Sequence, residues 1–162
     1  MYANTTSAMM QKTGQRLYTI GEAADLIGVS VPTIRMYERE GLIIPIRKAS
    51  RHRLFAEGDL ERIRSIRRTI NTEKVSIAGI RRLMSLVPCW KMNGCSEEQK
   101  AACPRVTADE SPCWMVSGKT WQGKSDTCRN CGVYMRTAEY AELKALLEEY
   151  GVDVTPEPVS KE

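Results

Sequence analysis

The residues whose chemistry stands out in this 162-residue sequence are six cysteines, all of which lie in the second half of the chain. They are Cys89, Cys95, Cys103, Cys113, Cys128 and Cys131. No histidine lies among them, so a metal bound there would be held mainly by sulfur. Four thiolates can hold either a zinc ion or an iron–sulfur cluster. Cys128 and Cys131 are the firmest pair, because their C-x-x-C spacing lets two sulfurs reach one ion.

The spacing favours an iron–sulfur cluster of four irons and four sulfurs over structural zinc. Cys103 precedes Pro104, as the closing ligand of ferredoxin-type runs often precedes a proline. The two C-x-x-C pairs of common zinc ribbons are absent. A cluster responds to oxidants, so this choice predicts a sensor of redox state, oxidant or metal supply, whereas zinc would be purely structural.

The residues around the cysteines predict a segment without a conventional core. Prolines and glycines are frequent there and aliphatic side chains are few, so we expect bound metal to supply folding free energy. A thiol–disulfide oxidoreductase using Cys128 and Cys131 is the enzymatic alternative. That motif normally opens a helix in a strand–helix–strand unit, which this sequence lacks, so we do not expect an enzyme.

Ahead of the cysteines, the stretch from Thr19 to Leu42 predicts two short helices joined by a tight turn. The first helix has one apolar stripe, formed by Ile20, Ala23, Ala24 and Ile27. Gly28 can turn the chain, Ser30 can cap the second helix, and Gly41 can end it. Two helices in this arrangement form a helix-turn-helix, whose second helix can enter the major groove of DNA.

The residues after Gly41 predict a hairpin and then two amphipathic helices. Apolar segments on either side of a polar turn suggest a wing over residues 42–55. From Asp59, an apolar stripe at helical spacing leaves Arg62, Arg64, Arg67 and Arg68 on a basic outer side. Ser76 caps the next helix, and Pro88 ends it. Arg81 and Arg82 project from this helix and are expected in solvent, with a DNA contact as the less favoured alternative.

These elements resemble the opening of a MerR-family transcriptional regulator. The resemblance is carried by YTIGEAADLIGVSVPTIRMYEREGLI at residues 18–43, then by Pro45, Arg47, RLF at 53–55 and DLERIRSIRR at 59–68. It implies a homodimer that binds a two-fold symmetric, double-stranded promoter site, with RNA polymerase at that promoter as a further partner. The family includes redox sensors that carry a cluster after the DNA-binding half.

The resemblance also implies which residues meet DNA. Thr33, Arg35 and Tyr37 would lie at the groove, although Tyr37 could instead pack in the core. The wing residues Arg47, Lys48, Arg51, His52 and Arg53 would lie against the phosphates. Arg51 and His52 replace the Gly-Tyr pair usual in the family. His52 has a second interpretation as a metal ligand, which is less favoured because no cysteine lies near it in sequence.

Charge and composition agree with a DNA-binding protein. Up to Val87 there are fifteen lysines and arginines against eight acids, and beyond it nine against twelve. The basic half is therefore the half with the helix-turn-helix, where cationic side chains can bind phosphate. No apolar run is long enough to span a membrane, and the first sixteen residues lack a signal-peptide core, so we expect a cytoplasmic protein.

The fold class that we predict is mainly α, with a winged helix-turn-helix, a small metal-bound cysteine module and a C-terminal helix. The paired Cys-Trp motifs at Cys89-Trp90 and Cys113-Trp114 resemble the two-CW module. In residues 137–150, heptad spacing relates Tyr140, Leu143, Leu147 and Tyr150, which could form a dimer seam or could pack on the chain's own cysteine module, and Gly151 is expected to end this helix. The predicted divisions are a flexible arm (1–16), the DNA-binding domain (17–87), the cysteine module (88–135), the helix (136–151) and a loose tail (152–162).

Overall fold

A computed structural model of the chain describes residues 16–48, 52–104, 111–116 and 128–152. The predicted arm and tail therefore lie almost entirely outside the described residues. The N-terminal elements are β1 (Tyr18–Thr19), α1 (Ile20–Ile27), α2 (Val31–Arg39), β2 (Ile46–Arg47), β3 (Arg53–Phe55), α3 (Glu57–Asn71) and α4 (Ile77–Leu86). The later ones are α5 (Cys89–Met92), α6 (Glu97–Ala101), α8 (Cys113–Val116), α10 (Gly132–Arg136) and α11 (Tyr140–Glu149).

The helix-turn-helix forms as its sequence predicts. Gly28 takes the left-handed conformation at φ 73°, which turns the chain after α1. The hydroxyl of Ser30 then accepts a hydrogen bond from the Thr33 N–H and caps α2. Gly41, at φ 74°, follows the end of α2. Local turn and cap chemistry therefore sets the angle between the two helices.

The wing is part of a three-stranded antiparallel sheet. The strand order is β1-β3-β2, with Ile46 opposite Leu54 on one side of β3 and Tyr18 opposite Phe55 on the other. The hairpin of β2 and β3 confirms the predicted wing, whereas the pairing of β1 has no counterpart in the sequence prediction. This pairing anchors the start of α1 to the base of the wing.

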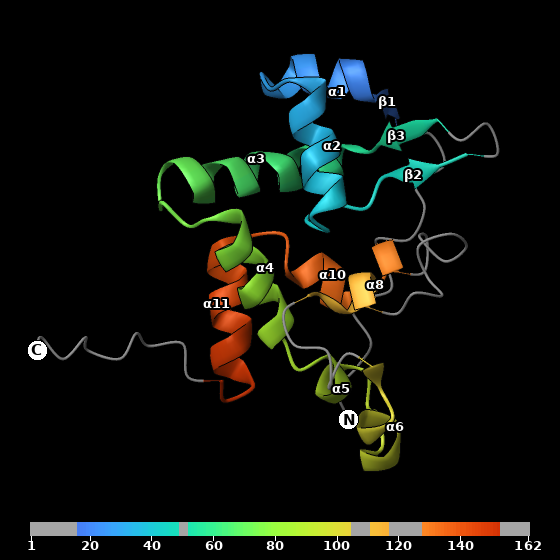
Figure 1. The fold of residues 1–162 in the computed structure, drawn as a ribbon, viewed down its shortest axis with the longest axis vertical. Coiled ribbons are helices and arrows are strands. Elements are labelled where there is room, and N and C mark those ends of the chain that lie inside the picture. The colour runs from blue at the N-terminus through green and yellow to red at the C-terminus, as the bar shows by residue number, and fades with distance from the viewer. Residues whose placement is uncertain (1–15, 49–51, 105–110, 117–127, 153–162) are drawn as a thin grey trace, which may run out of the picture.

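Helix α3 begins at Glu57 although Ala56 offers no side-chain cap. The Asp59 carboxylate accepts a hydrogen bond from the backbone N–H of Ala56 at 2.8 Å, so an acid in the first turn does part of the work of a cap. The predicted basic outer side of α3 is wrong for Arg62, whose side chain is only 3% exposed. Figure 1 shows α3 lying across the molecule between the helix-turn-helix and the pair α4 and α11.

One hydrophobic core joins the two halves of the described chain. It includes Ile34 and Phe55 from the N-terminal half, and Trp114, Val133 and Leu146 from the C-terminal half. The expectation that bound metal must replace a core in the cysteine-rich half is therefore corrected, because aromatic and aliphatic side chains there pack against the helix-turn-helix domain.

Helix α11 supplies much of that shared core. Leu143, Leu146 and Leu147 are each at most 2% exposed, and α11 packs on α3, α4 and α10. The left-handed Gly151 follows its C-terminus, as predicted. The leucines of the predicted dimer seam thus face the chain's own core, and of the two alternatives the structure supports intramolecular packing. Among the described residues, no helix is long and apolar enough to cross a membrane.

Candidate nucleic-acid interface

The exposed face of α2 carries most of the residues predicted at the groove. Arg35 is exposed and Thr33 partly so, while Ile34 is fully buried and fixes the helix on the core. Arg39, which the sequence prediction did not include, is also exposed and lies four residues after Arg35. Residues four apart share one helix face, and this spacing was the signal that could have identified Arg39.

Tyr37 does not share this exposed face. Its side chain is 4% exposed and belongs to the hydrophobic core. Burial raises the pKa of its phenol above the ordinary value. The predicted groove contact is corrected accordingly, and the core role that the sequence left open is the one observed.

The buried carboxylate of Glu38 ties the wing to the second helix. One oxygen accepts a hydrogen bond from Arg47 Nη2 at 2.8 Å, and the other accepts one from Arg53 Nε at 2.5 Å. The Glu38 side chain is 6% exposed, whereas those of Arg47 and Arg53 are 40% and 37% exposed. The buried carboxylate therefore orients both arginines, while part of each side chain remains at the surface.

The other predicted wing residues lie at or near the tip of the hairpin. Lys48 and His52 are exposed. Arg51 lies outside the described residues. Helix α2 and the wing thus present Thr33, Arg35, Arg39, Arg47, Lys48, His52 and Arg53 from two elements that Glu38 joins. On such a rigid cationic surface, the wing arginines can contact DNA phosphates while α2 lies in the major groove.

A second buried polar network lies behind α2, where the cysteine-rich half meets the domain. Arg62 donates to the carbonyl oxygens of Leu42 and Tyr134, both at 2.7 Å, and its guanidinium carbon lies 4.0 Å from the centroid of the Tyr134 ring. Burial of the guanidinium lowers its pKa below the ordinary value. The carbonyls and the ring compensate a cation that would otherwise be costly to bury.

The cysteines fall into two groups. Cys89, Cys113, Cys128 and Cys131 are partly buried and pack against the core. Cys95 is exposed, Cys103 is intermediate, and neither belongs to that packed set. All six are free of disulfide bonds.

The thiols are not assembled into a metal site in this arrangement. Among the described residues, which include all six cysteines, no three histidine, cysteine, aspartate or glutamate side chains are grouped so that they could hold an ion. The residues present therefore do not fit a four-sulfur site as they stand, and the predicted convergence of these cysteines is not observed. The metal-ligand interpretation of His52 gains no support either.

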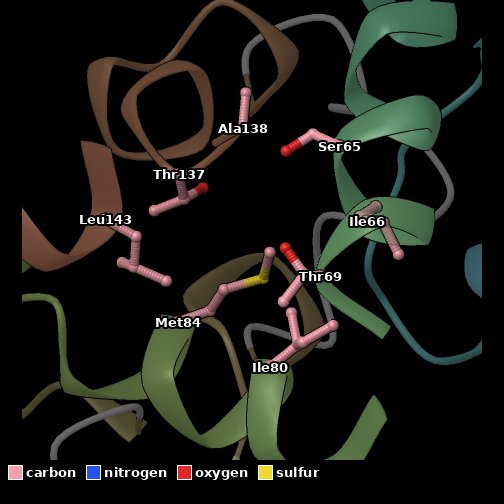
Figure 2. A pocket seen from close by; sticks show the side chains of 8 residues that line it. All are labelled: Ser65, Ile66, Thr69, Ile80, Met84, Thr137, Ala138 and Leu143. Carbon is pink, nitrogen blue, oxygen red and sulfur yellow. The ribbon is translucent and has the colours of Figure 1, made fainter. Parts of the chain in front are cut away.

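A small pocket lies between α3, α4 and the segment leading into α11 (Figure 2). Its lining is mostly apolar, with hydroxyls from Ser65, Thr69 and Thr137. The space of about 10 Å³ is close to that of a single water molecule. Known small-molecule sites are at least about thirty times larger, so this pocket does not accommodate an organic effector.

Comparisons with known proteins show what the N-terminal half is similar to. The model of the MerR HTH family regulatory protein matches residues 18–86. A putative heat shock protein HspR of Streptomyces coelicolor is 37% identical over 70 residues, which cover 43% of this chain and 46% of that protein. The HTH-type transcriptional regulator MlrA of Escherichia coli is 38% identical over 85 residues, covering 52% of this chain and 35% of MlrA.

A further relative carries heavy metal dependence in its name. The probable heavy metal-dependent transcriptional regulator of Haemophilus influenzae is 49% identical over 53 residues, which are 32% of this chain and 41% of that protein. The chain thus spans less than half the length of each of these relatives. No solved structure matches the chain.

Proposed function

We propose that this protein is a transcriptional regulator that binds double-stranded promoter DNA, since residues 18–86 form a helix-turn-helix domain that matches the MerR HTH family model. The observation that carries the proposal is the Glu38 link between α2 and the wing. This link fixes the position of α2 relative to the wing, and both elements carry arginines. A DNA duplex has fixed groove dimensions, so a protein surface that binds it needs such a fixed arrangement.

The residues divide by role. Thr33 and Arg35 contact the groove, with Arg39 as an addition from the same helix face. Arg47, Lys48, His52 and Arg53 contact the phosphate backbone, together with Arg51. These phosphate contacts fix register and contribute most of the salt dependence of binding. On the analogy of the family, the protein binds a two-fold site as a homodimer, with RNA polymerase at the same promoter.

The DNA assignment is tested by the double substitution Arg35→Ala and Arg53→Ala. Binding sites are first selected from fragmented genomic DNA with the wild-type protein, and affinity is then measured across a salt series. We expect the slope of log affinity against log salt to fall in magnitude by about 1 for each lost phosphate contact.

The control is Arg136→Ala, which removes one positive charge. Arg136 is an exposed arginine that pairs with Glu149 in the cysteine-rich half. Its slope should match that of the wild type. Equal slopes for the double variant and the wild type would contradict the proposed surface, and failure of the wild type to select any fragment would contradict DNA binding itself.

The proposal also covers the cysteine-rich half, which we take to be the regulatory part. Six cysteines within residues 89–131 are enough ligands for a thiophilic group once their sulfurs come together, with an iron–sulfur cluster that responds to redox state as the first candidate and structural zinc as the second. Metal analysis and visible spectra of protein purified without oxygen distinguish the two. Brown protein with iron and sulfide supports the cluster, and colourless protein with stoichiometric zinc supports the structural site.

A further inference from the structure

Two arginines outside the proposed DNA surface hold the two ends of α2. Arg67 comes from α3 and Arg81 from α4, and neither helix carries a residue of the surface formed by α2 and the wing. The sequence predicted Arg67 on a basic outer side and Arg81 in solvent. Both side chains are instead partly buried, and each has a partner next to one end of α2.

Arg67 holds the turn that precedes α2. Its Nη1 donates to the carbonyl oxygen of Ile27, the last residue of α1, at 2.8 Å. This oxygen lies at the negative end of the α1 dipole, where a cation is favourable. A Cβ at Gly28 would lie 3.9 Å from the same nitrogen, so the guanidinium lies against the turn itself. Burial raises the pKa of Tyr37 in α2, and the nearby charge of Arg67 opposes that rise.

Arg81 holds the other end of α2. Its Nη1 lies 2.9 Å from a carboxylate oxygen of Glu40, and its Nη2 donates to the hydroxyl of Ser111 at 3.0 Å. Glu40 is the C-cap residue of α2 and directly follows Arg39 on the proposed DNA surface. The side chains of the pair are 29% and 30% exposed, so water screens this pair less than a fully exposed one. Arg81 therefore fixes the residue at which α2 ends.

Packing alone would not fix the tilt of α2. Ile34 lies near the middle of the helix and is fully buried, so it anchors α2 at one point on the core. Packed helices show a scatter of about 15–20° in their crossing angles. For a helix of nine residues, a tilt of about 15° around its middle moves each end by about 2 Å. Bonds at both ends, such as those of Arg67 and Arg81, oppose this tilt.

A displacement of this size affects two kinds of DNA contact differently. Hydrogen bonds to base edges need donor–acceptor distances of about 2.7–3.2 Å, so they would break. Attraction to phosphates decays over a Debye length of about 8–10 Å, so it would hardly change. We propose that Arg67 and Arg81 are positioning residues, which set the sequence specificity of DNA binding without contacting DNA. This inference rests on the proposed function, of which it specifies the source of specificity.

The experiment compares two duplexes of equal length, one selected by the wild-type protein and one with the same bases scrambled. Affinity for each is measured across a salt series. We expect Arg67→Met and Arg81→Met each to lower the ratio of specific to non-specific affinity by about tenfold, the effect of about one lost base-pair contact. The slope of log affinity against log salt should stay that of the wild type, because no phosphate contact is lost.

Two control variants separate positioning from charge and from stability. Arg64→Met removes the same charge from an exposed residue of α3 that pairs with Glu57, and should leave the affinity ratio unchanged. Gly151→Ala destabilises the chain after the end of α11 and should also leave the ratio unchanged. Circular dichroism confirms that each variant is folded at the temperature of the binding measurement.

Conservative variants should restore specificity. Arg67→Lys keeps a donor for the Ile27 carbonyl and should retain most of the wild-type ratio. Arg81→Glu combined with Glu40→Arg exchanges the partners at constant net charge, and should recover most of what Arg81→Met loses. Glu40→Gln, which removes the charge that Arg81 binds, should lower the ratio as Arg81→Met does and is the second variant if a methionine variant does not fold.

The possible outcomes are distinct. An unchanged ratio in the variants that break either contact would overturn the proposal, as would an equal loss in Gly151→Ala. A lower salt slope in Arg67→Met or Arg81→Met would also overturn it, because that residue would then contact phosphate directly. If the wild-type protein does not distinguish the selected duplex from the scrambled one, it is the proposed function that fails.

Discussion

Arg129 and Asp59 form a bidentate ion pair, with Nη1 and Nη2 of the arginine 2.9 and 2.8 Å from the two carboxylate oxygens. Their side chains are only 14% and 6% exposed. Asp59 also accepts the Ala56 N–H at the start of α3. A single carboxylate therefore links the start of a helix in the helix-turn-helix domain to the residue that follows Cys128.

This pair predicts a large loss of stability in Arg129→Ala. Removing one partner leaves a buried carboxylate without its counter-charge, which costs about 3–5 kcal/mol in comparable pairs. The measurement is the free energy of unfolding in denaturant at neutral pH. The matched control is Arg136→Ala, whose pair with Glu149 is about half exposed on each side and should contribute at most about 1 kcal/mol. Equal losses in the two variants would refute the buried pair.

Gly41→Ala should destabilise the protein more than Gly151→Ala. Both glycines have φ 74°, so an added methyl group costs about 1–2 kcal/mol of backbone strain in either case. At Gly41 the methyl would also meet Met115 at 2.5 Å, whereas at Gly151 nothing lies within 4 Å. The difference in unfolding free energy between the two variants therefore isolates the contact with α8.

A second variant checks the origin of that difference. Met115→Ala in the Gly41→Ala background removes the obstructing side chain, so it should recover the part of the loss due to overpacking, about 1–3 kcal/mol. The backbone strain at Gly41 should remain. If Met115→Ala recovers nothing, α8 does not approach Gly41 as the structure shows.

Glu38→Gln should weaken DNA binding even though it removes a negative charge. The amide cannot accept a charged hydrogen bond from both Arg47 and Arg53, so the wing loses its fixed orientation and stability falls by about 1–2 kcal/mol. Glu57→Gln makes the same charge change at an exposed pair with Arg64. We expect electrophoretic mobility shifts to show lower affinity for Glu38→Gln and unchanged or slightly higher affinity for Glu57→Gln. The reverse order would contradict a positioning role for Glu38.

Tyr134→Phe should change how stability depends on alkaline pH. Near neutral pH the variant leaves the buried Ile44 N–H without its acceptor, at a cost of about 1–3 kcal/mol. Burial raises the pKa of Tyr134 above 10.0, so the folded state keeps this proton to higher pH than the unfolded state does. The stabilising contribution of that proton is complete below pH 10 and is lost as pH rises above it.

The wild type should therefore lose more stability than Tyr134→Phe between pH 9 and pH 11, and the gap between the two proteins should narrow. Denaturant unfolding at several pH values, followed by circular dichroism, measures this gap. A constant gap across the range would mean that the Tyr134 phenol titrates like an exposed one.

The sequence predicted those parts of the fold that depend on neighbours along the chain. The left-handed Gly28 and Gly151 and the capping Ser30 and Ser76 act within one helical turn of their own positions, so their roles can be read locally. The wing hairpin is similarly local. The chemistry of each residue and its spacing to the next apolar positions were sufficient for these elements.

The parts that the sequence did not predict depend on contacts between distant residues. Arg62 has the spacing of a surface arginine, and its burial depends on partners such as the carbonyls of Leu42 and Tyr134, which lie 20 and 72 residues away. Tyr37 was ambiguous for the same reason. Heptad spacing shows that the leucines of α11 share one face, but it does not show whether a second chain or α3 and α4 cover it. The groove and wing contacts themselves stay predictions.

The leucines of α11 have a consequence for engineering. Leu143, Leu146 and Leu147 cover α3 and α4, so the helix-turn-helix half does not end at residue 86, where its family resemblance stops. A chimaera that fuses residues 18–86 to a foreign sensor would leave an exposed apolar surface on α3 and α4. Such a hybrid would need a substitute for α11 before it could be expected to stay in solution.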